Sequence, residues 1–155
     1  MANVLFVCLG NICRSQMAET IFKKMVSDEN LSDVIEVDSA GTSSEEQGNP
    51  PHPGAVAELQ KRGLSMAGQV SRPITNEDFD WADLIIGMDN QNIFNLNRVA
   101  NSDDKAKIHL CLDIVNGKKG EEIQDPWYDH RFDRTYQQLS ESLPLWLDYV
   151  KNNLL

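Results

Sequence analysis

The stretch VLFVCLGNICRS, residues 4–15, joins a short apolar run to a polar loop and sets the architecture that we predict for the chain. The run is continuous and apolar, which favours a strand buried on both faces, over Asn3–Val7. Residues 8–15 contain two cysteines, one arginine and one serine, and apolar residues with helical spacing follow directly. A strand, a short loop and a helix in this order predict the first unit of a parallel α/β sheet.

Strand and helix patterns alternate along the rest of the chain. Three further segments have the composition of strands: Val34–Ser39, Ala82–Gly87 and Lys107–Leu110. Four segments have the pattern of helices: Ser15–Val26 with Ser15 as N-cap, Gly54–Arg62 ending at Gly63, Asn90–Val99, and Asp133–Leu155, which Pro144 bends or splits. A helical turn opens at Thr75–Glu77, and loops cover Ala40–Pro53 and Gly117–Asp129.

We therefore expect residues 1–155 to form one α/β domain, with a central four-stranded parallel sheet flanked by helices, as in flavodoxin-like and Rossmann-like folds. In such sheets, ligands bind at the carboxyl ends of the strands. Residues 8–15 follow the carboxyl end of the first predicted strand. The sequence therefore places its candidate site in this loop.

Charge and cysteine content limit the partners and the compartment that we expect. A formal net charge of −10 argues against nucleic acid and anionic membranes as partners, because both require basic surface. No segment has the pattern of a signal peptide or the apolar length of a membrane span. Three cysteines cannot form a fully paired secreted framework. We expect a reduced, cytoplasmic protein, in which cysteines more often serve catalysis or metal binding than cross-linking.

The loop has the residue types of an anion site with a nucleophile at its base. Backbone N–H groups before a helix, together with the positive end of the helix dipole, can cradle a tetrahedral oxyanion. Arg14 can add a two-pronged contact, and the same groups stabilise a thiolate at Cys8, to which Ser15 can donate a hydrogen bond. The alternative is a buried, inert Cys8 with Arg14 in a surface salt bridge. The predicted phosphate-binding residues are Leu9, Gly10, Asn11, Ile12, Cys13 and Arg14.

The loop CLGNICRS after an N-terminal strand resembles the active-site loop of the low-molecular-weight protein tyrosine phosphatases. Further stretches support the resemblance over nearly the whole chain: DSAGT (38–42), GNPPHP (48–53), ITNEDFDWADLIIGMD (74–89) and DPWY (125–128). The resemblance implies a phosphatase that hydrolyses phosphotyrosine and small aryl phosphates through a cysteinyl-phosphate. It implies no metal and no cofactor, and its partners would be tyrosine-phosphorylated proteins or peptides, with the chain a monomer or weak dimer.

The resemblance also assigns roles to single residues. Cys8 would be the nucleophile, Arg14 would bind the phosphoryl group, Ser15 would stabilise the thiolate, and Asn11 would hold the shape of the loop. Asp125 would be the general acid that protonates the leaving phenolate and then the base that activates water.

The chemistry of DPWY agrees with the role that the resemblance gives to Asp125. An aryl ester leaves faster when its oxygen is protonated as the bond breaks, and a carboxylic acid on a nearby loop can do this. Trp127 and Tyr128 offer flat apolar surface for a phenyl ring. Read alone, DPWY is an ordinary turn with packed aromatic residues, and Asp129 and Asp133 are rival acids.

Several positions leave alternatives open. Cys13 either pairs reversibly with Cys8 and shelters it from irreversible oxidation, as the resemblance favours, or fills the inner face of the loop. Cys111 is expected in the core. Asp89 either orients the loop or caps the following helix. Glu45 is expected in the cleft beside Trp127 and Tyr128. Glu45 and Glu46 stand where many family members carry an aromatic side chain, and an acidic wall there would repel acidic phosphopeptides and favour basic or different substrates.

Two related activities and one non-catalytic role are the rival interpretations. The stretch RSQMAE also resembles thioredoxin-coupled arsenate reductases, but the chain lacks the further cysteine pair that those enzymes need. Ile12 stands where protein-arginine phosphatases carry a threonine, and its bulk favours an aryl ester over phosphoarginine. A phosphate-binding module without catalysis would need neither a nucleophile nor an acid.

Overall fold

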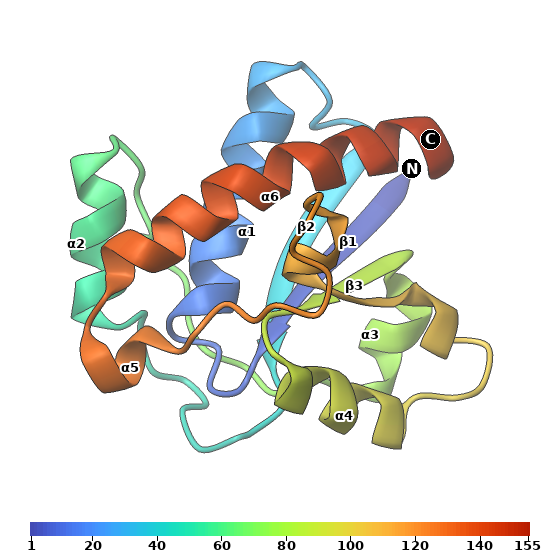
Figure 1. Cartoon of the computed structure of the whole chain (residues 1–155), viewed down its shortest axis with the longest axis horizontal. Helices are drawn as coiled ribbons and strands as arrows, with labels where there is room; N and C mark the ends of the chain where they lie inside the picture. The colour runs from blue at the N-terminus through green and yellow to red at the C-terminus, as the bar shows by residue number, and fades with distance from the viewer.

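The first apolar run forms strand β1, Ala2–Cys8, near the centre of the sheet in the computed structural model, which describes residues 1–155 (Figure 1). On one side β1 pairs in parallel with β2, Ile35–Gly41, and on the other with β3, Leu84–Gly87. Strand β4, Ile108–Leu110, pairs in parallel with β3. The order β2-β1-β3-β4 confirms the predicted four-stranded parallel sheet.

Helices cover both faces of the sheet (Figure 1). One face carries α1 (Arg14–Asp28), α2 (Pro53–Lys61) and α6 (Phe132–Asn153), and the other carries α3 (Asn76–Trp81) and α4 (Asn90–Val99). The short helical segments are η1 (Lys105–Lys107), η2 (Cys111–Ile114) and α5 (Pro126–Asp129). No helix combines the length and the apolar character needed to cross a membrane.

Alternation along β1 explains why its sequence is continuously apolar. Val4 and Phe6 pack into the larger core with α1 and α6, while Leu5 and Val7 pack into the smaller core under α3 and α4. Because successive side chains of a strand point to opposite faces, a strand covered on both sides needs apolar residues at every position. This burial holds the carboxyl end of β1 in place, and the loop of residues 8–13 begins there.

Two sequence predictions about helix boundaries were wrong. Helix α1 begins at Arg14 with Cys13 at the N-cap position, so Ser15 is not the cap. The hydroxyl of Ser15 instead contacts the sulfur of Cys8 at 3.0 Å and accepts a hydrogen bond from Asn11 at 2.7 Å. The predicted loop over Gly117–Asp129 ends in a helical turn, α5, because Asp125 caps it by accepting from the N–H of Trp127 at 3.1 Å.

Pro144 does not split the terminal helix, which runs unbroken through it. Pro144 lies on the exposed side of α6, where the carbonyl that loses its partner one turn earlier can bond to water. Leu143 and Leu147 are buried on the opposite side and hold α6 on the core across the proline. The packing of this face outweighs the lost backbone hydrogen bond.

Acid should weaken the fold in part through His109 in β4. Burial lowers the pKa of this imidazole below its ordinary 6.5, and the Asp113 charge and the Ala106 carbonyl offset this only in part. As the pH falls below 6.5, the unfolded chain therefore binds the proton before the folded chain does. The free energy of unfolding then decreases until the pH reaches the lower pKa of His109 in the folded chain.

We expect the free energy of unfolding by urea to be smaller at about pH 5 than at about pH 7.5, with a smaller difference in His109→Gln. Part of the pH dependence should remain in this variant, because the pKa of His52 is also lowered in the folded chain, chiefly by burial. An identical pH dependence in the variant and the wild type would contradict the assignment to His109.

Candidate active site

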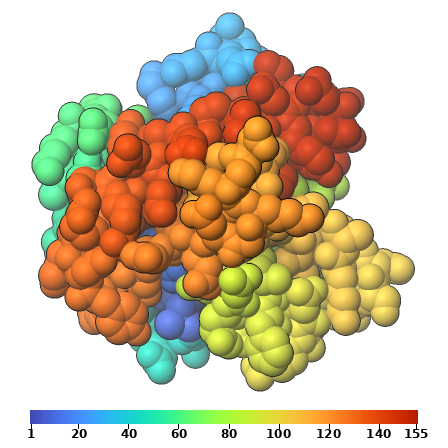
Figure 2. Space-filling view, in the orientation of Figure 1, coloured from blue at the N-terminus to red at the C-terminus, as the bar shows by residue number.

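The loop after β1 forms the floor of a cleft of about 190 Å³. In the space-filling view the blue N-terminal residues lie recessed between the orange and the yellow-green segments (Figure 2). The cleft is lined by Cys8, Leu9, Gly10, Ile12, Cys13, Arg14, Ser43, Glu45, Glu46, Asp125, Trp127 and Tyr128. All the predicted phosphate-binding residues except Asn11, and all the predicted cleft residues, thus line one cavity, and Asn11 lies buried beneath it.

The loop backbone turns its N–H groups and its carbonyls in different directions. None of the N–H groups of residues 9–14 donates a hydrogen bond to another protein group. The carbonyls of four residues of the stretch, Cys8, Leu9, Gly10 and Ile12, accept from Thr42 N–H, Ser43 N–H, Ser71 Oγ–H and His52 N–H, at 2.8–3.0 Å. A run of unpaired N–H groups on one loop before a helix is an anion-binding nest.

Asn11 holds this loop in shape. It adopts a left-handed backbone conformation, φ 56°, which asparagine tolerates better than most residues. Its side chain is fully buried and donates to Ser15 at 2.7 Å and to Ser39 at 3.0 Å, while its Oδ1 accepts from the N–H of Arg72 at 3.0 Å. The side chain thereby ties the loop to α1, to β2 and to the segment after α2.

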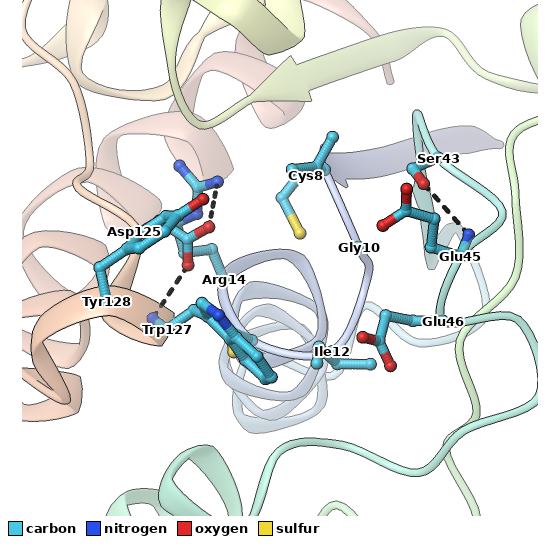
Figure 3. A pocket seen from close by; sticks show the side chains of 12 residues that line it. Cys8, Gly10, Ile12, Arg14, Ser43, Glu45, Glu46, Asp125, Trp127 and Tyr128 are labelled. Atoms are coloured by element: carbon cyan, nitrogen blue, oxygen red, sulfur yellow. Dashed lines mark hydrogen bonds and ion pairs between the residues drawn. The ribbon is translucent and has the colours of Figure 1, made fainter.

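Cys8 points its sulfur into the cleft (Figure 3). Its only side-chain hydrogen-bond partner is the Ser15 hydroxyl, with Sγ and Oγ 3.0 Å apart. Because Asn11 already donates to that hydroxyl oxygen, the proton of Ser15 is free to point at the sulfur. A hydroxyl proton in this position stabilises a thiolate.

Arg14 is buried in the wall of the cleft and has one edge that forms no hydrogen bond. Its Nη1 donates to Asp89 Oδ2 at 2.7 Å and to the carbonyl of Ile123 at 2.8 Å. Nη2 lies 3.5 Å from Asp125 Oδ2, and Nε has no hydrogen-bond partner although it is buried. The edge formed by Nε and Nη2 is the one that can bind two oxygens of an oxyanion.

Neighbouring charges raise the pKa of the Arg14 guanidinium. Burial alone would lower the pKa of this guanidinium, but the charges of Cys8, Asp89 and Asp125 outweigh it and raise the pKa. The sequence left two roles open for Asp89, orienting the loop or capping a helix, and the structure shows a contact for each. One carboxylate oxygen pairs with Arg14 at the end of the loop, and the other caps α4 by accepting from Asn92 N–H at 2.8 Å.

Two unlike walls face each other across the cleft (Figure 3). Asp125, Trp127 and Tyr128 come from the start of α5, and Glu45 and Glu46 come from the loop after β2. Neither glutamate forms an ion pair, and only Glu46 accepts a side-chain hydrogen bond, from Asn49 at 2.7 Å. A ligand that enters between the walls meets flat apolar surface on one side and unpaired negative charge on the other.

The rival acids lie outside the cleft. Asp129 pairs with Arg134 at 2.8 Å and Asp133 with Arg131 at 3.0 Å, and these partners help to lower the pKa values of both carboxyls. The hydrogen bond that Asp129 accepts from the Arg131 N–H is the largest contribution to its shift, and the bond from the Arg131 side chain is the largest for Asp133. Asp125 is the only aspartate that lines the cleft.

The three cysteines are free thiols in different surroundings. Cys13 lines the cleft but is buried, and burial together with the neighbouring charge of Cys8 raises its pKa, so that it favours the neutral thiol. Cys111 is fully buried, as expected for a core residue, and burial raises its pKa to about 12, while the hydrogen bond to Ser142 lowers it in part.

Several contributors were missed by sequence reasoning. Ser43 lines the cleft, the carbonyl of Ile123 holds Arg14, and Ser39 and Glu19 lie in the hydrogen-bond network behind Asn11. A weak signal for Glu19 was available, because a carboxylate there falls beside the apolar positions of the predicted first helix. No group of three or more His, Cys, Asp or Glu side chains is arranged to hold a metal ion.

Comparisons with known proteins agree with this geometry. A family model described as low molecular weight phosphotyrosine protein phosphatase matches residues 3–154. The protein of that name from Rattus norvegicus is 47% identical over 140 residues, covering 88% of this chain and 87% of that one. The crystal structure of YfkJ from Bacillus subtilis superposes with a TM-score of 0.95 at 36% identity, over 100% of this chain and 98% of that one. The crystal structure described as DARP, drosophila arginine phosphatase, superposes with a TM-score of 0.88 at 36% identity, over 97% of this chain and 98% of that one.

Proposed function

The chain belongs to the low molecular weight phosphotyrosine protein phosphatase family, and from this premise we propose that Cys8, Arg14 and Asp125 are its catalytic residues. It is a protein tyrosine phosphatase, and enzymes of this family act through a cysteinyl-phosphate. The observation that carries the residue assignment is the cleft itself. One cavity contains a thiol within hydrogen-bond distance of the Ser15 hydroxyl, an arginine edge that forms no hydrogen bond, unpaired N–H groups and a carboxyl group.

In the first step, the thiolate of Cys8 attacks phosphorus in line with the ester oxygen. The S–P bond forms as the P–O bond breaks, and Asp125 gives its proton to the departing phenolate oxygen. The N–H groups of residues 9–14 and the free edge of Arg14 bind the three remaining phosphoryl oxygens, where negative charge collects.

In the second step, the Asp125 carboxylate takes a proton from water as that water attacks phosphorus. The S–P bond breaks, inorganic phosphate forms, and the electron pair returns to Cys8 as a thiolate. Ser15 Oγ lies 3.0 Å from Cys8 Sγ. A hydrogen bond from this hydroxyl stabilises the thiolate both before the first step and as the leaving group of the second.

The cleft shape supports an aryl ester as substrate. Ile12 on the floor and Trp127 on the wall give a phenyl ring two apolar surfaces.

We further infer that residues 1–155 act as one catalytic domain in the cytoplasm, as a monomer or weak dimer, since three free thiols suit a reducing compartment. The net charge of −10 supports protein substrates over nucleic acid or an anionic membrane.

Replacing the nucleophile tests the covalent step. We expect Cys8→Ser to lose at least about 1000-fold in turnover of para-nitrophenyl phosphate with a chelator present, because serine lacks a comparably stable anion. Binding of inorganic phosphate, measured by calorimetry, should remain, since the N–H groups and Arg14 are unchanged. Wild-type turnover in this variant would rule out Cys8 as the nucleophile.

Replacing the acid tests the role of Asp125. We expect Asp125→Asn to slow phenyl phosphate by about 100-fold or more, and para-nitrophenyl phosphate much less, because a stable leaving group needs no proton. The check is the ratio of the two kcat/KM values in variant and wild type. Equal losses on both substrates would show that Asp125 is not the proton donor.

The acidic wall should select substrates by charge. Between two phosphotyrosine peptides that differ only in lysine or glutamate flanks, we expect kcat/KM to favour the lysine peptide by about three- to tenfold at low salt, and less at high salt. Glu45→Gln with Glu46→Gln should remove most of this preference. Glu36→Gln, at the amino end of β2, is the matched control and should keep it. The absence of any preference in the wild type would contradict this role for the wall.

A further inference from the structure

We propose that Glu19, on α1 beneath the catalytic loop, is a positioning residue that keeps the Ser15 proton on Cys8 by acting through Ser39 and Asn11. The inference rests on the proposed role of Cys8 as nucleophile. It adds a residue that lines no part of the cleft and touches no substrate.

A continuous chain of hydrogen bonds joins Glu19 to the nucleophile. Ser39 Oγ donates to Glu19 Oε1 at 2.6 Å, and Asn11 Nδ2 donates to Ser39 Oγ at 3.0 Å. The same Nδ2 donates to Ser15 Oγ at 2.7 Å, and Ser15 Oγ lies 3.0 Å from Cys8 Sγ. All five residues are buried, so water does not compete with these contacts.

The carboxylate at one end fixes the direction of the first hydrogen bonds. An ionised carboxylate can only accept hydrogen bonds, so the single hydroxyl proton of Ser39 must be donated to Glu19. Ser39 can then offer Asn11 only a lone pair, which requires the NH₂ group of Asn11 to face it. The second N–H of Asn11 points to Ser15, whose own proton is left for Cys8.

The orientation of the Asn11 amide is therefore held from two sides. The N–H of Arg72 donates to Asn11 Oδ1 at 3.0 Å, and the Ser39–Glu19 pair accepts at Nδ2. If Ser39 did not donate to Glu19, its hydroxyl proton could point at Asn11 instead. It would then compete with the N–H of Arg72 for Asn11 Oδ1. A rotated Asn11 would then present its oxygen to Ser15 and draw the Ser15 proton away from the sulfur.

Lys23 holds the second oxygen of the Glu19 carboxylate. Its ammonium lies 2.6 Å from Glu19 Oε2, one helical turn along α1, which leaves Oε1 to accept from Ser39. The pair with Lys23 also offsets the negative charge beneath the loop. Glu19 thus acts on the thiolate by orienting hydroxyl and amide groups, and the repulsion between the two negative charges is reduced.

The test measures how readily Cys8 reacts as a thiolate. In Glu19→Gln, Lys23 attracts the amide oxygen, and the NH₂ group turns toward Ser39, which reverses the direction of the chain. We expect the alkylation by iodoacetamide against which inorganic phosphate protects to slow by about three- to tenfold at about pH 6. Little change is expected at about pH 9, above the ordinary pKa of about 8.5 for a free thiol. Glu19→Asp, which keeps the charge but draws it back from Ser39, should slow the reaction in the same direction.

Two further variants test the path. In a Ser39→Ala background, Glu19→Gln should cause no additional slowing, because Glu19 acts only through that hydroxyl. Adding Lys23→Met to Glu19→Gln should restore much of the rate, since the amide oxygen is then free to accept from Ser39. Glu58→Gln is the matched control: Glu58 is also buried on a helix and paired with Arg62 at 3.3 Å, but it lies outside the chain of hydrogen bonds.

The outcomes separate this inference from the proposed function. Unchanged alkylation at about pH 6 in folded Glu19→Gln, or equal slowing at both pH values, overturns the positioning role. Slowing in Glu58→Gln as large as that in Glu19→Gln overturns it as well. If wild-type alkylation is not slowed by inorganic phosphate, or if Cys8→Ser keeps full turnover, the role of Cys8 as nucleophile fails instead.

Discussion

The orientation of the backbone over residues 8–14 is the constraint on which the rest of the structure depends. Six consecutive N–H groups without protein partners would be costly in a closed core, and they are tolerated here because they line a cleft. The loop is held in this conformation by its carbonyls, which bond to neighbouring segments, and by Asn11 behind it. Gly41 belongs to the same arrangement, because a Cβ there would lie 2.8 Å from the carbonyl oxygen of Leu9.

The sheet and the helices provide the fixed points for this loop. Strand β1 is buried on both faces, so its carboxyl end cannot shift without disturbing two cores. Helix α1 begins directly after the loop and adds the positive end of its dipole to the site. Asp89 after β3 and the carbonyl of Ile123 then hold Arg14 from the other side. The geometry of the site thus depends on packing at several distant points of the chain.

Local charge and overall charge have opposite signs in this protein. The chain carries a net charge of −10, yet the floor of the cleft combines N–H dipoles with a buried guanidinium. Arg14 is surrounded by the charges of Cys8, Asp89 and Asp125, which keep it protonated while leaving its Nε edge unpaired. Negative charge returns on the opposite wall, in Glu45 and Glu46, neither of which forms an ion pair.

The sequence by itself determined the parallel sheet, the place of the site and the residue types in it, because these depend on local patterns. A continuous apolar run, helical spacing and the C-x5-R loop are all read within a few residues of one another. The partners of those residues were decided by the tertiary structure. Asp89 pairs with Arg14 75 positions away, and Glu19 reaches the loop through Ser39 of β2. A side-chain hydroxyl or carboxylate can bond to whatever the fold brings within about 3 Å, and no local pattern records which segment that will be.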